Sequence, residues 1–289
     1  MQKRDISKPD WLKIKLSTDK GYRETGRIIR EHSLNTICSS GRCPNQNECW
    51  SRGTATFMIL GDICTRSCGF CATKTGKPSV VNDNEAHEIA QSVKLLGLKH
   101  CVITSVTRDD LDDQGANHWF KVINECKRVN PETTIEILIP DFRADKKLID
   151  LVISAKPHII GHNIETIQRL TPAVRSGANY QTSLNVLKHL SQSGVYTKSG
   201  LMAGLGERPD EVEEALRDLY NYGCRIVTVG QYLKPGPNHI PVVEYITPQQ
   251  FDYYSEYALK TGFDYAFCGP LVRSSYLAEK ALDKLKSKV

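Results

Sequence analysis

Residues 64–71 read Cys64-Thr-Arg-Ser-Cys-Gly-Phe-Cys71 and bring three cysteines onto one short stretch of this 289-residue chain. An apolar run, Thr54-Ala-Thr-Phe-Met-Ile-Leu60, precedes them, and Gly61-Asp62 separates the two. β-Branched and aromatic residues bounded by glycine are typical of a strand. The sequence therefore predicts a strand over 54–60 and places Cys64, Cys68 and Cys71 on the loop that leaves it.

The spacing of these cysteines is typical of metal ligands and not of disulfide partners. Tetrahedral zinc usually takes four protein ligands, and no nearby residue completes such a set. A cubane iron–sulfur cluster held by three thiolates leaves one iron free to bind something else. We expect an iron–sulfur site here, with zinc as the alternative.

Composition indicates a globular protein in a reducing compartment. The opening Met1–Asp10 is charged and lacks the apolar core of a signal peptide, and no stretch is long enough to span a bilayer. Ten cysteines in such a chain favour metal or redox chemistry, so we expect a cytoplasmic protein without a membrane partner. The net charge of +5 is compatible with an acidic protein partner or an ordinary solvated surface, and it is too diffuse to indicate nucleic acid binding.

Six predicted strands alternate with helical patterns, which implies parallel βα units in an open doubly wound sheet or a barrel. No Gly-x-Gly-x-x-Gly follows the first strand, and six units are too few for a complete eight-fold barrel. We expect an α/β fold, a partial (β/α)6 TIM-like barrel over 54–245, flanked by extensions over 1–53 and 246–289. The expected strands are Thr54–Leu60, Cys101–Val106, Thr134–Ile139, His158–Gly161, Tyr196–Met202 and Arg225–Val229.

A second set of cysteines, Cys38, Cys43 and Cys49, lies in a segment rich in Gly, Pro and Asn. This composition predicts a loop that could wrap a ligand, within an irregular segment 1–53. The spacing alone leaves zinc, or scattered loop thiols, as alternatives. Among the other cysteines, Cys101 and Cys126 fall on a strand and a helical pattern, where cysteine behaves as a small apolar residue, and Cys268 is expected in a loop.

Polar residues follow several predicted strands and indicate a binding cleft at their carboxyl ends. Asn163 and Glu165 suit hydrogen bonds to a ribose or an amine, although loop solvation and helix capping would explain them as well. We interpret His100 and His162 as core or loop residues. A charged amphipathic tail over Leu277–Val289 closes the chain.

Cys-x3-Cys-x2-Cys with Phe70 before the last cysteine resembles the signature of the radical S-adenosylmethionine (SAM) superfamily. The resemblance implies a partial barrel, a four-iron cluster on Cys64, Cys68 and Cys71, and SAM chelated at the open iron, with Phe70, Asn163 and Glu165 as candidate SAM contacts. Gly200-x-Met202-x-Gly204-x-x-Glu207 is similar to a strand motif used near adenine, although glycines at an ordinary turn would look the same.

Taken together, the motifs resemble the lipoyl synthase family over about residues 30–280. They comprise both cysteine sets, Arg273-Ser-Ser-Tyr276, Thr104-Ser-Val-Thr-Arg-Asp-Asp-Leu111, Thr197-Lys-Ser-Gly-Leu-Met202, Gly204-Leu-Gly-Glu207 and Gly230-Gln-Tyr-Leu-Lys-Pro235. The chain departs from the family at Asp113-Gln114-Gly115, where a Gly-Gly pair is expected, and at Gly161, where Asn is usual.

The family resemblance implies an auxiliary four-iron cluster on Cys38, Cys43, Cys49 and Ser275, although Ser275 would also suit a helix N-cap. It implies radical SAM-dependent insertion of sulfur from that cluster at C6 and C8 of a protein-bound octanoyl-lysine. The implied partners are lipoyl carrier domains, of the 2-oxoacid dehydrogenase E2 or glycine cleavage H protein type, and an electron donor such as flavodoxin or ferredoxin. A biotin-synthase-like sulfurtransferase and a non-catalytic zinc or iron–sulfur module are the alternatives.

Overall fold

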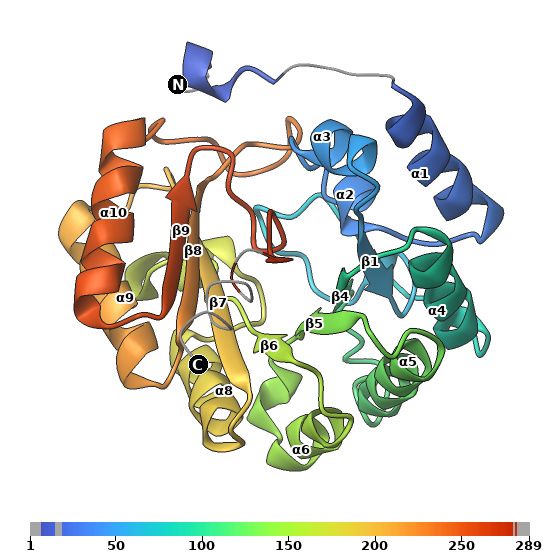
Figure 1. Cartoon of the computed structure of the whole chain (residues 1–289). Coiled ribbons are helices and arrows are strands. Elements are labelled where there is room, and N and C mark those ends of the chain that lie inside the picture. Colours follow the sequence, from blue (N-terminus) through green and yellow to red (C-terminus); the bar gives the residue numbers. More distant parts are fainter. Residues whose placement is uncertain (1–6, 15–18, 280, 282–289) are drawn as a thin grey trace.

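A computed structural model describes residues 7–14, 19–279 and 281 and contains a seven-stranded parallel sheet (Figure 1). All six strands expected from the sequence are present within a few residues of their predicted ends. A seventh strand, β9, follows them. The strands are β1 (Thr56–Ile59), β4 (His100–Ser105), β5 (Thr134–Leu138), β6 (Ile159–Gly161), β7 (Tyr196–Ala203), β8 (Ile226–Gln231) and β9 (Tyr265–Gly269).

The order of the strands decides between the two predicted architectures. Neighbours in the sheet run β1-β4-β5-β6-β7-β8-β9, which is the order along the chain. A doubly wound sheet reverses its strand order at a switch point, whereas a barrel does not. The edge strands β1 and β9 do not pair with each other, so the fold is a partial TIM-like barrel, as predicted.

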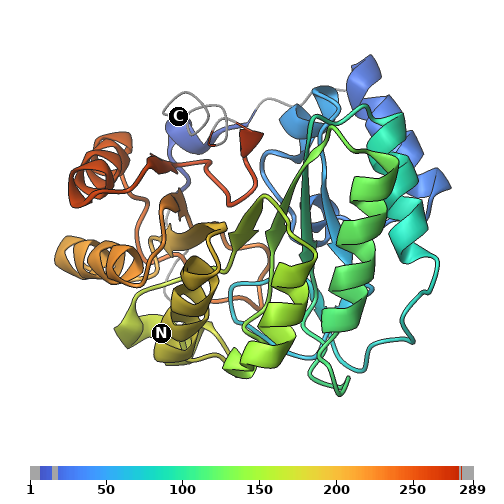
Figure 2. The same ribbon diagram turned by 60° about the horizontal axis from the view of Figure 1, so that its bottom comes forward.

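Helices form the outer layer of the barrel (Figures 1 and 2). None of those in the described part of the chain is long and apolar enough to cross a membrane. The crossover helices are α4 (Glu85–Leu95), α5 (Ala116–Val129), α6 (Lys146–Ser154), α7 (Thr171–Val174), α8 (Tyr180–Gln192) and α9 (Pro209–Asn221), and α10 (Pro248–Thr261) precedes β9. Short 3-10 turns occur at Asp10–Leu12, Phe142–Ala144 and Gln168–Leu170.

The two faces of each strand have different roles. Because successive side chains point to opposite faces, one set packs under the helices and the other points into the barrel. On the outer face the side chains are apolar and almost fully buried, for example Phe57, Ile103 and Ile137. The inward set lines cavities inside the barrel and includes Met58, His100, Val102, Thr104, Glu136, Leu138, Lys198, Gly200 and Met202.

The irregular structure predicted for 1–53 is wrong over 20–31, 37–40 and 46–51. The chain forms α1 (Lys20–Glu31), α2 (Ile37–Ser40) and α3 (Gln46–Ser51), so Cys38 and Cys49 lie on helices and only Cys43 lies in the turn between them. Each helix is short, and α1 is held by packing against α3. The Tyr22 and Trp50 rings lie 5.5 Å apart.

The C-terminal segment differs from the prediction in one respect. Cys268 lies in strand β9 and not in a loop, and it is half-buried. The chain then turns back between the edge strands β1 and β9 (Figure 1), where it meets the N-terminal helices. Asn45 Nδ2 donates to Leu271 O at 2.7 Å, and the Tyr276 hydroxyl donates to Glu48 at 3.0 Å. Most of the predicted amphipathic tail lies outside the described residues.

Candidate active site

The loop that carries the first cysteine set is anchored at the carboxyl ends of the strands. Cys64 ends a short strand, β2 (Ile63–Cys64), which pairs with β3 (Lys74–Thr75). The backbone N–H groups of Arg66 and Thr107 lie 3.4 Å from Cys64 Sγ and donate to it. These two hydrogen bonds hold the Cys64 sulfur in a fixed position at the start of the loop.

Arg66 fixes this loop to two neighbouring strands. Its guanidinium forms bidentate pairs with Asp109 and Asp141, at 2.7–3.0 Å, from the segments that follow β4 and β5. Burial raises the pKa of Asp141, but the hydrogen bonds and charge of Arg66 outweigh it and hold that pKa at about 2. The fork geometry of arginine makes this a rigid attachment.

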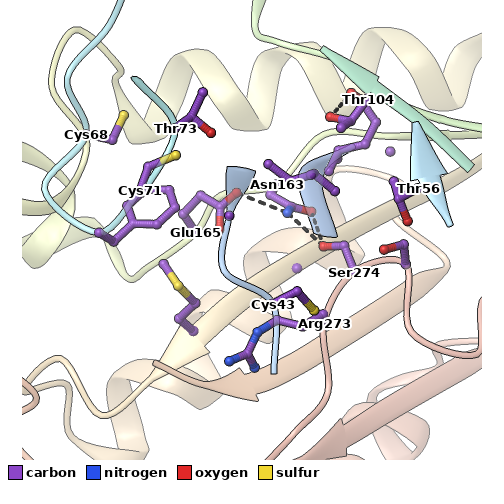
Figure 3. Close-up of a pocket in the computed structure, with 18 of the residues that line it drawn as sticks. Cys43, Thr56, Cys68, Cys71, Thr73, Thr104, Asn163, Glu165, Arg273 and Ser274 are labelled. Carbon is purple, nitrogen blue, oxygen red and sulfur yellow. Dashed lines mark hydrogen bonds between the residues drawn. The ribbon is translucent and has the colours of Figure 1, made fainter. Parts of the chain in front are cut away.

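Asn163 and Glu165 follow β6 and lie in the same cavity as the first cysteine set (Figure 3). Asn163 Nδ2 donates to Glu165 Oε1 at 3.0 Å and to Ser274 Oγ at 2.8 Å. Desolvation raises the pKa of Glu165, and the nearby charge of Arg175 opposes that shift. The hydrogen bond from Asn163 to Ser274 joins the segment after β6 to the turn that follows β9.

The motif Gly200-x-Met202-x-Gly204-x-x-Glu207, which was predicted to lie near adenine, has residues in two different roles. Gly200 and Met202 line the cavity, as does Phe70. A Cβ at Gly200 would lie 2.7 Å from Thr228 Oγ1 and 3.0 Å from Ser274 Oγ, so a larger residue there would force these side chains to move. Glu207 instead accepts hydrogen bonds from the backbone N–H groups of Gly204 and Leu205 and shapes the turn after β7.

One cavity of about 380 Å³ receives thiols from both cysteine sets. A smaller adjoining cavity is lined by all four residues of the predicted auxiliary set, and three of these four line both cavities. Cys64, Cys68, Cys71, Cys38, Cys43 and Ser275 line the large cavity, and Cys38, Cys43, Cys49 and Ser275 line the small one.

Burial favours the protonated form of the three thiols of the second cysteine set and of Cys68 and Cys71. Burial raises the pKa of Cys38 and Cys68 to about 11 and that of Cys49 to about 12. Across 7–14, 19–279 and 281, no three His, Cys, Asp or Glu side chains converge as ligands of a single metal ion do. The cysteines border open space instead.

Four further charged residues line the cavity, and two of them, Glu136 and Arg175, were not predicted to do so. Arg273 and Arg175 line it from the turn after β9 and from the segment after α7, and Glu136 and Lys198 line it from the strands. The two strand residues carried a usable signal, because each is a charged residue within an apolar run. Arg273 stands in the Arg273-Ser-Ser-Tyr276 motif, whereas Arg175 carried no signal beyond its residue type.

Comparison with known proteins identifies the family. The model of the radical SAM superfamily matches residues 58–219. The lipoyl synthase of Phocaeicola vulgatus is 58% identical over 275 residues, which cover 95% of this chain and 97% of that protein. This chain belongs to the lipoyl synthase family. The lipoyl synthase of Treponema denticola is 54% identical over 94% of both chains.

Solved structures support the fold of this lipoyl synthase family member. Streptococcus suis SuiB bound to S-adenosylmethionine superposes with a TM-score of 0.60 at 12% identity, over 85% of this chain and 59% of SuiB. Methylornithine synthase (PylB) gives a TM-score of 0.55 at 14% identity, over 91% and 92% of the two chains. At these identities the similarity concerns the barrel alone.

Proposed function

We propose that this chain inserts two sulfur atoms, at C6 and C8, into an octanoyl group linked to a lysine of a lipoyl carrier domain. Family membership supports the reaction type. The observation that carries the proposal is the cavity onto which both cysteine sets open. A reaction that joins radical formation to sulfur transfer needs both centres to reach the same substrate carbon.

The donor sets fit two iron–sulfur clusters. Cys64, Cys68 and Cys71 would hold one cluster through three thiolates. Cys38, Cys43 and Cys49, with Ser275 as the fourth ligand, would hold the auxiliary cluster. When bound, the first cluster with SAM supplies hydrogen abstraction and the second supplies sulfur. Soft thiolates suit iron. A serine oxygen is a harder and weaker ligand, which suits an iron that the serine must later release.

The contacts of SAM would come from Phe70, Asn163 and Glu165. The carboxylate of Glu165 and the amide of Asn163 offer the acceptors and donors that an amine and a ribose need. Phe70 adds an apolar wall next to Cys71. Since Asn163 also bonds Ser274, the SAM side of the cavity and the turn that bears Ser275 are held in a fixed relation.

The cavity onto which both cysteine sets open is lined largely by apolar side chains, which suits an alkyl chain and keeps water away from reactive carbon. Each buried methylene of an octanoyl group contributes about 0.8 kcal/mol to binding. The lining residues include Met58, Val102, Leu138, Leu201 and Val272.

The partners we propose are carrier domains of the 2-oxoacid dehydrogenase E2 or glycine cleavage H protein type, and a flavodoxin or ferredoxin as electron donor. The net charge of +5 is compatible with acidic partners. We place the reaction in the cytoplasm, where thiols stay reduced.

The test compares Ser275→Ala and Cys68→Ala with the wild-type chain, supplied anaerobically with SAM, dithionite and an octanoyl-lysyl peptide. Ser275→Ala should keep 5′-deoxyadenosine formation and lose sulfur insertion, measured by mass spectrometry. Cys68→Ala should lose both. Wild-type yields of lipoyl peptide from Ser275→Ala would contradict the role of that serine, and a four-iron plus two-iron content would indicate a biotin-synthase-like enzyme.

A further inference from the structure

Three buried polar side chains from three strands form a connected network inside the barrel. Lys198 Nζ, on β7, donates to Glu136 Oε1, on β5, at 2.6 Å. His100 Nε2, on β4, lies 3.2 Å from the other oxygen of Glu136. The three side chains are only 3–8% exposed. Desolvation raises the pKa of Glu136, but the charge of Lys198 and the hydrogen bonds outweigh it, so the pKa lies below its usual value and the pair is ionic.

The ion pair lies deep in the large cavity. Glu136 is in register with Val102 on β4. Because strands rise about 3.3 Å per residue, Val102 lies about 10 Å before Ser105, where β4 ends. Thr107, just beyond that end, donates its backbone N–H to Cys64 Sγ. Glu136 and Lys198 both line the cavity, so they form a charged floor below the first cysteine set.

This floor adjoins the second cysteine set. Val102 lines both the large and the small cavity, and the small cavity is also lined by His100 and by Cys38, Cys43, Cys49 and Ser275. Under the proposed function, C8 is the methyl end of the octanoyl chain and receives sulfur from the cluster of that set. The chain therefore ends close to the ion pair.

A charged floor is a poor neighbour for an alkyl chain. In an apolar pocket each additional methylene tightens binding about fourfold. The ammonium of Lys198 has three donors, of which Glu136 Oε1 takes one. An alkyl carbon offers no acceptor, so a methylene pressed against this pair would leave charged donors without a partner and would weaken binding.

We propose that the Glu136–Lys198 pair sets the length of the acyl chain that the cavity accepts, because it ends the apolar part of the cavity where the eighth carbon lies. This assignment rests on the proposed function, which supplies the octanoyl substrate. A chain of eight carbons fills the apolar part, whereas a chain of ten carbons meets the two charges.

The test measures binding of octanoyl-lysyl and decanoyl-lysyl peptides by anaerobic isothermal titration calorimetry. The full chain carries reconstituted clusters and SAM but receives no reductant, so no turnover occurs. We expect the wild-type chain to bind the decanoyl peptide about tenfold more weakly than the octanoyl peptide, whereas an apolar floor would make its binding about 15-fold tighter.

The double variant Glu136→Gln/Lys198→Met removes both charges, keeps the length of each side chain and leaves a polar partner for His100. We expect its ratio of decanoyl to octanoyl affinity to rise at least about tenfold, with the affinity for the octanoyl peptide within about threefold of the wild-type value. A ratio equal to that of the wild type would overturn the proposal.

A third ligand tests the wild-type chain and so does not depend on the folding of a variant. The terminal hydroxyl of a 10-hydroxydecanoyl-lysyl peptide can accept from Lys198, whereas in an apolar pocket the same hydroxyl would cost binding free energy. We expect the wild-type chain to bind it about tenfold more tightly than the decanoyl peptide, and the double variant to reverse this order. Weaker or equal binding by the wild-type chain would overturn the proposal.

The matched control is Glu85→Gln, on the outer helix α4. Glu85 Oε2 lies 2.6 Å from His118 Nε2, and both side chains are as little as 9% exposed. This variant also neutralises a buried carboxylate and should keep the wild-type ratio of affinities; a shift equal to that of the double variant would overturn the proposal. If the wild-type chain binds the octanoyl peptide no better than the unacylated peptide, the proposed function itself is wrong, and this assignment falls with it.

Discussion

Gly230→Ala should separate radical formation from sulfur insertion. Gly230 is on β8, and the turn that carries Ser275 passes directly over it. A Cβ at this position would lie well inside 3.0 Å of the Val272 carbonyl oxygen and 3.2 Å from Arg273 Nη1. The first of these atoms is backbone, so it cannot rotate away.

The expected size of the effect follows from this contact. Real Cβ atoms stay at least 3.0 Å from such neighbours, so the turn must move outward by about 1 Å. A displacement of 1 Å at a reacting centre costs on the order of 100-fold in rate. We expect lipoyl product to fall by that factor. Formation of 5′-deoxyadenosine should fall less, because the displaced turn reaches the SAM side of the cavity only through the Asn163–Ser274 hydrogen bond, whereas Ser275 moves with the turn itself.

The assay measures both products by mass spectrometry from the same anaerobic reaction. Gly269→Ala is the matched control, because Gly269 pairs with Gly230 in the sheet register and its Cβ would approach a side-chain methyl, Val272 Cγ2, at 3.1 Å and not the backbone. An unchanged ratio of the two products in Gly230→Ala, or an equal loss in Gly269→Ala, would refute the reasoning.

Two further predictions concern stability. Gly115→Ala should lower the melting temperature. Gly115 has φ +87°, and a Cβ would lie 2.5 Å from Leu60 Cδ1; the backbone strain and the overpacking together cost about 2–4 kcal/mol. A melting temperature equal to that of the wild type in scanning calorimetry would contradict this. Asp141→Asn should lower the free energy of urea unfolding at pH 7 by about 3 kcal/mol, since it leaves Arg66 with Asp109 alone. The pKa of Asp141 is depressed to about 2 from an ordinary value of 3.8. The Asp141 carboxylate therefore contributes fully to the free energy of unfolding above pH 3.8, and this contribution is lost as the pH falls through about 2. A difference between the wild type and Asp141→Asn that changes between pH 7 and 5 would argue against this pairing.

The strands that could be predicted are those with continuous apolar runs. In Thr134–Leu138 three of the five residues are β-branched, the central three are buried, and Glu136 alone interrupts the apolar run. Helix α1 was missed because only Thr25, Gly26, Ile28 and Ile29 are buried among its charged residues, and Trp50 on α3 completes its packing from outside the segment. Strand β9 was missed because its aromatic residues are only half-buried and stand next to a glycine-proline turn.

The parts of the site that could be predicted are those whose residues lie close together in the sequence. Both cysteine sets were located by spacing, and their ligand roles remain predictions. The Lys198–Glu136–His100 network could not be predicted, since its members are 36 and 62 residues apart and meet only through the parallel register of the sheet. Sequence patterns report the period of a strand but not which strand lies beside it.

The gap between β1 and β9 has a consequence for access to the barrel. A barrel closed by a strand could be opened only by breaking a ladder of backbone hydrogen bonds, whereas here the closure relies on a few side-chain contacts such as Asn45 to Leu271 and Arg52 to Glu279. Segments with so few bonds open at lower free energy than the sheet. Amide hydrogen exchange should accordingly be faster at 271–279 than in β8, so this seam can open while the rest of the barrel stays folded.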